Sequence, residues 1–359
     1  MRLNPFKAIK FDSNYWQSND FSLLDNCDTK NKIDKTKFIM NFLEEKINNG
    51  VAKIDYEPSL YILNVATSEK SVTSIIGEIN YNDKDIFFPN EEIHKDKLEF
   101  YKSIFDEYKM QINPVLTFYR GSESVVSITK SIMEKEPEIS TVIKGMKYKL
   151  WKVSDLENLN KIIKTLEKID ELYIADGHHR FAMFHNQEKF LNTKIMVSIT
   201  DSDSILLKSC HRVITKNITP SWRKKLEEYC DLNQINPNNA SQSDKILIKF
   251  RDGKLFEVKF KYDKFHDTAM HRIIKNTIIQ YSFEIEDYNN QVFPVGGNMS
   301  VEKSDQIFKN YQNGSAIIFV PNIQMSEFFK VLDSGNKLPP TTTWFEPKII
   351  DGFLISKYF

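Results

Sequence analysis

Apolar residues with strand-like and helix-like spacing alternate along the whole chain. Within residues 34–49, apolar side chains recur every four positions, which predicts a helix, and Gly50 stands where a helix-ending glycine is favoured. Residues 60–66 and 73–79 are rich in β-branched and aliphatic side chains and flank a polar turn, so they predict a β-hairpin. The first part of the chain therefore combines a helix with paired strands.

The same mixture continues to the end of the chain. Short apolar runs predict strands at 114–119, 148–153, 172–175, 194–200, 205–208, 245–250, 255–262 and 316–320. Helical spacing predicts helices at 96–108, 181–190, 222–229, 267–281 and 325–332. Residues 154–157, Ser-Asp-Leu-Glu, have the pattern of a capping box that opens a helix reaching about residue 168. The Asp252-Gly253 pair between two strands favours a second hairpin.

These elements indicate an α+β fold with a mixed sheet, hairpins and surrounding helices. A length of 359 residues accommodates one large domain or two smaller ones. A boundary near residues 215–220 divides the chain into an N-terminal lobe, 1–215, and a C-terminal α/β lobe, 216–359.

Charge and cysteine content narrow the class of protein. Lys and Arg number 49, as do Asp and Glu, so the formal net charge is zero, which argues against a protein that coats nucleic acid or an anionic membrane. The cysteines Cys27, Cys210 and Cys230 are widely spaced and form no CxxC pair, which is typical of a reduced cytosolic protein. No signal peptide is recognisable, and the apolar runs are too short to span a bilayer. We therefore expect a cytoplasmic protein without a nucleic acid or membrane partner.

Polar and charged side chains that could bind a ligand are most concentrated between a predicted buried strand and a predicted helix. This segment reads Ile-Ala-Asp-Gly-His-His-Arg at residues 174–180. Gly177 permits a tight turn and the close approach of a phosphate. A helix N-terminus follows, where backbone N–H groups and the helix dipole favour an anion, and His178, His179 and Arg180 add side-chain donors. Together these features predict a phosphate cradle, with Asp176 placed to hold a metal or a substrate amine.

Two other interpretations of the segment remain. An Asp-Gly corner between a strand and a helix is often only a turn. A zinc site formed by His178, His179 and His185 is weaker, because the spacing does not place all three on one helical face and no cysteine completes the ligand set.

In sequence order, this motif and several others resemble the bacterial relatives of the archaeal free serine kinase, a domain-of-unknown-function family with a ParB/sulfiredoxin-like core. The resemblance covers most of the chain. Its most specific segments are Ala-Asp-Gly-His-His-Arg and Pro-Pro-Thr-Thr-Thr-Trp-Phe-Glu-Pro-Lys at 339–348. The weaker ones are Asn-Pro-Phe-Lys-Ala-Ile at 4–9, Pro-Ser-Leu-Tyr-Ile at 58–62, Asn-Pro-Val-Leu at 113–116, Leu-Trp-Lys-Val at 150–153, His-Arg-Val-Ile at 211–214 and Val-Gly-Gly at 295–297.

The resemblance implies a kinase that phosphorylates the hydroxyl of free L-serine, or of a related hydroxy amino acid, with ATP or ADP as donor and Mg²⁺, giving O-phospho-L-serine. It places a catalytic Glu at Glu91; the residues alone leave Glu91 and Glu92 open as the base. The family has a His where this chain has Asn90, a Thr where it has Ile93, and a Pro-Tyr-Asp-Val stretch where this chain has a different sequence at 21–27. These differences concern the acceptor more than the phosphate site.

The resemblance also assigns roles in the second half of the chain. It makes Asp176 a catalytic residue and Mg²⁺ ligand, and Arg212 and Trp344 substrate-binding residues. From their own chemistry, the hydroxyls and backbone N–H groups of Thr341, Thr342 and Thr343 are expected to bind the nucleotide's phosphates together with residues 177–180, or else the substrate carboxylate. The alternative interpretation of the Thr run is an extended loop crossing the surface. The Gly296-Gly297 pair is either a strand end that closely approaches the ligand or a turn, and the His271-Arg272 pair is interpreted as structural.

Two alternatives belong to other classes of protein. One is a ParB-like nucleotide-binding regulatory protein without small-molecule kinase activity. The other is a redox enzyme like the sulfiredoxin branch of the fold, which requires a cysteine in the phosphate loop; residues 176–180 contain none.

Overall fold

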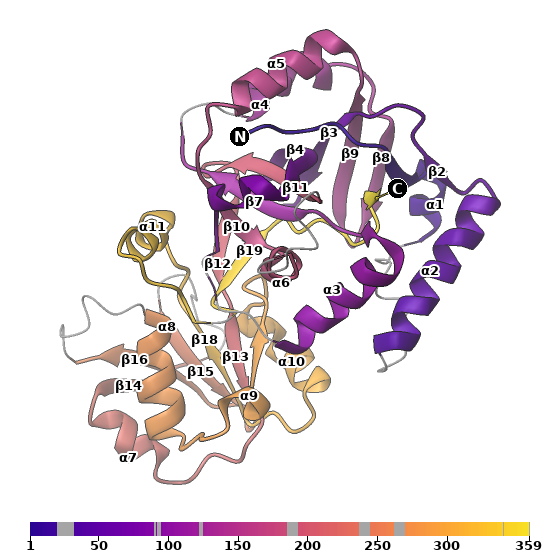
Figure 1. Cartoon of the computed structure of the whole chain (residues 1–359). Helices are drawn as coiled ribbons and strands as arrows, with labels where there is room; N and C mark the ends of the chain where they lie inside the picture. Colours follow the sequence, from indigo (N-terminus) through magenta and orange to yellow (C-terminus); the bar gives the residue numbers. More distant parts are fainter. Residues whose placement is uncertain are drawn as a thin grey trace. The chain divides into compact units, whose positions relative to one another are not determined.

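The computed structural model describes residues 1–19, 32–89, 91, 95–121, 125–184, 193–236, 245–261, 270–339 and 341–358 (Figure 1). The chain folds into two units. The first contains Met1–Leu206 together with Pro347–Phe359, and the second contains Leu207–Glu346. The sequence had placed one boundary between residues 215 and 216. The structure places it earlier, because β13 (His211–Ile214) is an inner strand of the second unit's sheet, and it returns the last segment to the first unit.

The first unit is built on an eight-stranded sheet of order β5-β10-β7-β11-β4-β3-β9-β8. Two pairs, β5/β10 and β7/β11, are parallel and the remaining pairs are antiparallel, so the expected mixed sheet and the β3/β4 hairpin are confirmed. The strands are β3 (Leu60–Ala66), β4 (Ser71–Asn80), β5 (Phe87–Phe88), β7 (Val115–Tyr119), β8 (Ile139–Ile143), β9 (Met146–Val153), β10 (Leu172–Asp176) and β11 (Lys194–Asp201).

Both faces of this sheet are buried. Along β3, Leu60 and Ile62 belong to one hydrophobic core and Tyr61 and Leu63 to another, as the two-residue period of a strand requires. Helices α4 (Val125–Met133), α5 (Leu156–Leu166) and α6 (His178–Ala182) contribute to the first core, and α1 (Ser13–Ser18) and α2 (Lys32–Asn48) to the second. Because both faces are covered, β3 is apolar at nearly every position.

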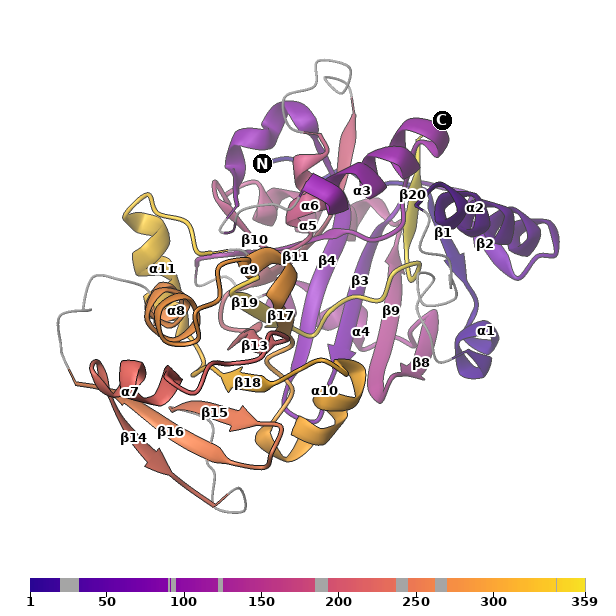
Figure 2. The same cartoon turned by 90° about the horizontal axis from the view of Figure 1, so that it is seen from below.

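A smaller sheet joins the two ends of the chain (Figure 2). Its order is β2-β1-β20-β6, with β1 (Ala8–Phe11) antiparallel to both β2 (Ala52–Ile54) and β20 (Ile355–Lys357). β6 (Met110–Gln111) directly follows α3 (Lys95–Tyr108) and pairs with β20. The N-terminal and C-terminal strands thus lie side by side within the first unit.

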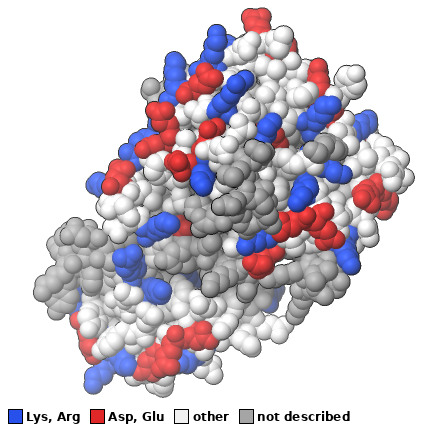
Figure 3. All heavy atoms as spheres, viewed as in Figure 1, with Lys and Arg blue, Asp and Glu red and all other residues white. Residues whose placement is uncertain are grey.

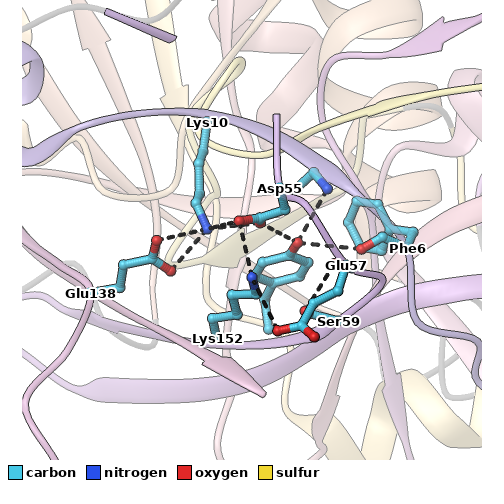
Figure 4. A network of polar contacts seen from close by, with 9 residues as sticks. Phe6, Lys10, Asp55, Glu57, Ser59, Glu138 and Lys152 are labelled. Atoms are coloured by element: carbon cyan, nitrogen blue, oxygen red, sulfur yellow. Dashed lines mark hydrogen bonds and ion pairs between the residues drawn. The ribbon is translucent and has the colours of Figure 1, made fainter. Parts of the chain in front are cut away.

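A buried polar network, the Lys10 network, ties β1 to the eight-stranded sheet (Figure 4). The Lys10 ammonium lies 2.9 and 2.7 Å from the two carboxylate oxygens of Asp55 and 2.8 Å from Glu138. The Tyr61 hydroxyl donates to Asp55 at 2.5 Å, and Lys152 Nζ lies 3.3 Å from the same carboxylate. The network is therefore internally satisfied and acts as a structural clamp.

The second unit has a six-stranded antiparallel sheet of order β14-β16-β15-β18-β13-β17 and a two-stranded sheet, β12-β19. Helix α7 and the π-helix η5 cover one face of the larger sheet. The 3₁₀-helix η6 and α10 cover the other face. The strands are β12 (Leu206–Ser209), β13, β14 (Cys230–Gln234), β15 (Ile246–Phe250), β16 (Leu255–Phe260), β17 (Val292–Val295), β18 (Ala316–Phe319) and β19 (Thr343–Glu346). The helices are α7 (Trp222–Glu227), α8 (Met270–Ile273), η5 (Ile274–Ser282), α9 (Tyr288–Gln291), η6 (Val301–Lys303), α10 (Ser304–Asn310) and α11 (Met325–Asp333).

Three details differ from the sequence expectations. The helix after residue 153 is capped by Asp155, whose side chain accepts from the Asn158 N–H, so the expected box is shifted by one residue. The helix expected from residue 181 begins at His178, and residues 185–190 of that expectation lie outside the described residues. Of the helix expected at 267–281, the described part forms α8 followed by the π-helix η5, and residues 267–269 lie outside the described residues.

Two further observations concern the charge of the surface and the length of the helices. On the face drawn in Figure 3, basic and acidic side chains are interspersed, in keeping with the zero net charge. Among the described residues, no helix has the length and apolar character needed to cross a membrane.

Candidate functional site

The loop that joins β10 to α6 has the backbone of a specialised corner. A bulge interrupts the pairing of β10 with β7 between Ile174 and Asp176, and such bulges re-aim the side chains beside them. Gly177 follows with φ +97°, a left-handed conformation that other residues adopt at a cost. A Cβ at Gly177 would lie 2.8 Å from Arg180 Nη2, so the glycine also admits the Arg180 side chain against the turn.

Asp176 anchors two cations at the end of β10. Its Oδ2 accepts from Arg180 Nη2 at 2.8 Å, and its Oδ1 accepts from Lys348 Nζ at 3.1 Å. Burial alone would raise the pKa of the Asp176 carboxyl, but the charges of Lys348 and Arg180 outweigh it and hold the pKa well below its ordinary value. Asp176 is therefore an anion at neutral pH, paired on both oxygens.

The segment after the second unit completes the surroundings of Arg180. Asp351 Oδ1 lies 4.0 Å from Arg180 Nη1 and accepts from Asn113 Nδ2 at 2.7 Å. Asn113 also donates to the backbone oxygen of Ile349 at 3.2 Å, which fixes this segment beside the start of β7. The Arg180 guanidinium lies 5.7 Å from the centre of the Tyr101 ring, a cation–π distance.

Arg180 retains one donor that no described residue satisfies. The side chain is 6 % exposed, and its Nε is a buried atom without a hydrogen-bond partner among the described residues. A buried N–H left unpaired costs free energy, so the atom marks a position where an acceptor is missing. His178 is also buried, and its burial lowers the pKa to about 4, so this imidazole is neutral at physiological pH.

The parallel pair β5/β10 relates Glu91 to this loop. Phe88 at the end of β5 pairs with Tyr173, and both strands run in the same direction. Glu91 lies three residues after Phe88 in the sequence, and Asp176 lies three residues after Tyr173. Glu91 is buried, with 9 % of its surface exposed. Both carboxylates therefore follow the carboxyl ends of neighbouring parallel strands, an edge where ligands bind in open sheets.

The remaining predicted site residues belong to the second unit. Thr342 is fully buried, and its backbone oxygen accepts from the Cys210 N–H at 2.9 Å; its Oγ1 has no described partner. Thr341 adopts φ +54°, and Thr343 begins β19. Trp344 donates to Glu346 at 3.0 Å, and a Cβ at Gly296 would lie 2.8 Å from its ring.

Arg212 lies on β13 with 4 % of its surface exposed. The structure thus brings residues 176–180 together in the first unit and describes the Arg212 and Thr341–Trp344 group within the second. That the two groups share one ligand stays a prediction.

Four residues of the site, Lys348, Asp351, Asn113 and Tyr101, had no predicted role. Two of them had a visible signal, because Lys348 ends the Pro-Pro-Thr-Thr-Thr segment and Asn113 opens the Asn-Pro segment, both noted for the resemblance. Asp351 and Tyr101 stood in no motif.

A metal cluster is absent from the described part of the chain. No group of three or more His, Cys, Asp or Glu side chains there is arranged to hold an ion. Of the three histidines in the zinc hypothesis, His185 lies outside the described residues.

The sequence profile described as "Protein of unknown function (DUF1015)" matches residues 20–286. The chain belongs to this family. No curated protein matches this chain. Among solved structures, C-terminally truncated SbnI from Staphylococcus aureus is similar with a TM-score of 0.43 and 11 % identity, over 77 % of this chain and 85 % of that one.

A free serine kinase in complex with AMP is similar with a TM-score of 0.41 and 13 % identity, over 80 % of this chain and 94 % of the other. A conserved hypothetical protein from Pyrococcus furiosus has a TM-score of 0.41 and 13 % identity, over 77 % and 93 %. With TM-scores below 0.5, these similarities transfer no activity to the DUF1015 chain. The ParB/sulfiredoxin-like core stays a prediction.

The site residues fit the two expected ligands unequally. The unsatisfied Arg180 Nε, beside Lys348 and after a left-handed glycine, suits the oxygens of a phosphate. Direct coordination of Mg²⁺ by Asp176 does not fit the arrangement, since both carboxylate oxygens already face cations. The geometry favours Asp176 as the residue that positions Lys348 and Arg180.

Proposed function

We propose that this DUF1015 protein is a small-molecule kinase that transfers a phosphoryl group from ATP or ADP to the hydroxyl of free L-serine or a related hydroxy amino acid. The observation that carries the proposal is the Asp176–Arg180 corner, where a buried guanidinium keeps an unsatisfied donor beside Lys348. The motif resemblance names the reaction. The cytoplasm is its proposed location, which suits the buried Cys210 and Cys230, neither of which forms a disulfide.

The residues at the corner supply what phosphoryl transfer requires of a protein, which is positioning and neutralisation of charge. Arg180 Nε and the Lys348 ammonium donate to oxygens of the transferred group, and Asp176 holds both cations in place. Gly177 lets the phosphate approach the backbone, and the side chains of His178 and His179 line the turn. His178, being neutral, contributes a hydrogen bond without charge.

Glu91 is proposed as the general base. Its carboxylate takes the proton of the acceptor hydroxyl as that oxygen forms a bond to the terminal phosphorus. The bond between this phosphorus and the bridging oxygen of the nucleotide breaks, and the nucleotide leaves with one phosphate fewer. The parallel exit of β5 and β10 supports this role, because it carries Glu91 and Asp176 to the same edge. Mg²⁺ would enter with the nucleotide and offset the charge of its phosphates.

The remaining residues of the proposal belong to the second unit. Thr341, Thr342 and Thr343 would bind the nucleotide's phosphates, and the buried, unpartnered Thr342 Oγ1 supports a polar role there. Arg212 and Trp344 would bind the amino-acid acceptor.

The test is formation of O-phosphoserine by the full-length protein with L-serine, Mg²⁺ and either ATP or ADP, detected by mass spectrometry and ³¹P NMR. Glu91→Gln should abolish or strongly reduce product while nucleotide still binds. Glu44→Gln, an exposed change on α2, is the matched control and should leave turnover intact. Absence of product with both nucleotides and several hydroxy amino acids would overturn the proposal. Nucleotide binding without turnover in either form would instead indicate a regulatory protein.

A further inference from the structure

Arg212 is a charged residue in a row of apolar core positions. It lies on the inner strand β13, paired with Ile318 and Pro294, and two residues before Ile214, which packs in the core beneath η5. Its surface is 4 % exposed. A buried guanidinium in such a position is costly unless an anion or several acceptors compensate it.

The partners of Arg212 are all neutral. Nε donates to the Tyr288 hydroxyl at 3.1 Å, and Nη1 donates to the backbone oxygens of Cys210 and His211 at 3.3 and 3.2 Å. Within the described residues no carboxylate lies within 4.0 Å of the guanidinium, and its Nη2 makes no hydrogen bond there. Both N–H donors of Nη2 therefore lack an acceptor among the described residues and are available to a bound oxyanion.

A second cation, Lys275, also contacts Tyr288. Lys275 Nζ lies 4.8 Å from the centre of the Tyr288 ring and forms no ion pair with a described residue. Because Tyr288 accepts from Arg212, its own O–H remains able to donate. Lys275 belongs to the π-helix η5, a distortion that occurs frequently at functional sites.

His271 lies near Arg212 and adds no charge of its own. It lies one turn before Lys275, is buried, and has Nε2 3.1 Å from Ser209 Oγ. Burial, with the nearby Arg212 and His211, keeps its pKa well below the ordinary value. Arg212 thus contacts the hydroxyl of Tyr288 and Lys275 contacts its ring, and neither cation forms an ion pair with a described acid.

We propose that Arg212, Lys275 and Tyr288 form an oxyanion-binding site within the second unit. The ligand is a carboxylate or a phosphate group, since both present paired oxygens that match a guanidinium edge and accept from an ammonium and a phenol. The site extends the acceptor-binding role proposed for Arg212 and rests on that proposal where its ligand is the acceptor's carboxylate. All three residues lie in Leu207–Glu346, so anion binding can be measured without kinase turnover.

The experiment titrates the full-length protein with inorganic phosphate and, separately, with acetate, by calorimetry at constant ionic strength. At least one anion should bind saturably. Lys275→Gln should weaken the binding at this site about 10-fold, as loss of a charge-assisted contact predicts, and Arg212→Met should remove the same binding component. Any phosphate bound at the Asp176–Arg180 corner should remain in both variants. Tyr288→Phe should weaken it as well. Lys259→Gln removes one exposed lysine from β16 of the same unit and should change nothing.

The outcomes separate the hypotheses. Phosphate binding alone identifies a phosphate ligand, acetate binding alone a carboxylate, and both support the shared chemistry. The proposal is overturned if neither anion saturates, if Lys275→Gln binds like the unmodified protein, or if Lys259→Gln weakens binding equally. If Arg212→Met fails to fold, the anion affinities of Lys275→Gln and Tyr288→Phe still test the proposed site. O-phosphoserine formation is measured independently, so loss of the kinase hypothesis leaves this result standing.

Discussion

Replacement of Lys10 by methionine tests whether the Lys10 network holds the first unit together. Lys10 is 6 % exposed, and its ammonium contacts Asp55 and Glu138 at 2.7–2.9 Å. Methionine preserves much of the aliphatic stem and removes the charge. Asp55, whose side chain is 9 % exposed, would then remain in place with one cation fewer.

The expected loss in the free energy of unfolding depends on how well the Asp55 carboxylate stays compensated without Lys10. Removing one partner of a buried ion pair costs about 3–5 kcal/mol, because the other charge stays buried without compensation. Here Lys152 still lies 3.3 Å from Asp55, Tyr61 still donates to it, and Glu138 is 40 % exposed and can turn to water. We therefore expect a loss near the lower end, about 3 kcal/mol in the free energy of unfolding.

Urea unfolding combined with amide hydrogen exchange gives the measurement, since exchange distinguishes the two units. The loss should appear in peptides from β1, β3 and β9 and leave the second unit's sheet unchanged. Lys46→Met, which removes a surface partner of Glu45, is the control and should cost less than about 1 kcal/mol. A Lys10→Met loss as small as the control's, or one spread equally over both units, would refute the reasoning.

The same network predicts the direction of the pH dependence. Burial alone would raise the pKa of Asp55, but hydrogen bonds from Lys10 and Tyr61 and the charges of Lys10 and Lys152 outweigh it and lower the pKa. The stability from Asp55 is therefore present above its unfolded pKa, about 3.9, and is lost as the pH falls toward the lower folded pKa. Lys10→Met should flatten this acid limb.

The sequence predicted the parts of the fold that depend on neighbours in the chain. The β3/β4 pair was visible because strand, turn and strand follow one another, and α2 and α5 because their apolar spacing repeats over several turns. The strands β1, β6 and β20 were not predicted. Each is two to four residues long, and each gains its hydrogen bonds from a segment distant in the sequence, which no local pattern encodes.

The candidate site also contains residues that the sequence predicted and residues that it did not. Residues 176–180 were predicted because their chemistry is contiguous. Lys348 was not, because its contact with Asp176 spans 172 residues and depends on the return of the last segment to the first unit. This contact also changes the role expected of Asp176, since a carboxylate paired on both oxygens is a poor direct ligand for Mg²⁺.

Three further changes test individual groups. Gly177→Ala should cost about 1–2 kcal/mol of stability, measured by thermal unfolding, because alanine resists φ +97°; an unchanged stability would contradict the left-handed corner. Glu91→Gln should lower the rate of phosphoserine formation by about 10²–10⁴ and leave nucleotide affinity nearly unchanged, so full activity would exclude Glu91 as the base. Glu78→Gln should stabilise the first unit at pH 7 by about 1 kcal/mol. Glu78 is buried on β4, and burial raises its pKa despite the hydrogen bond from Ser356. A raised folded pKa means that stability falls as the pH rises from the unfolded pKa through the folded one. The glutamine variant should therefore gain stability at pH 7 but not at pH 4, and equal stability of both proteins at pH 7 would show that the buried carboxylate carries no penalty.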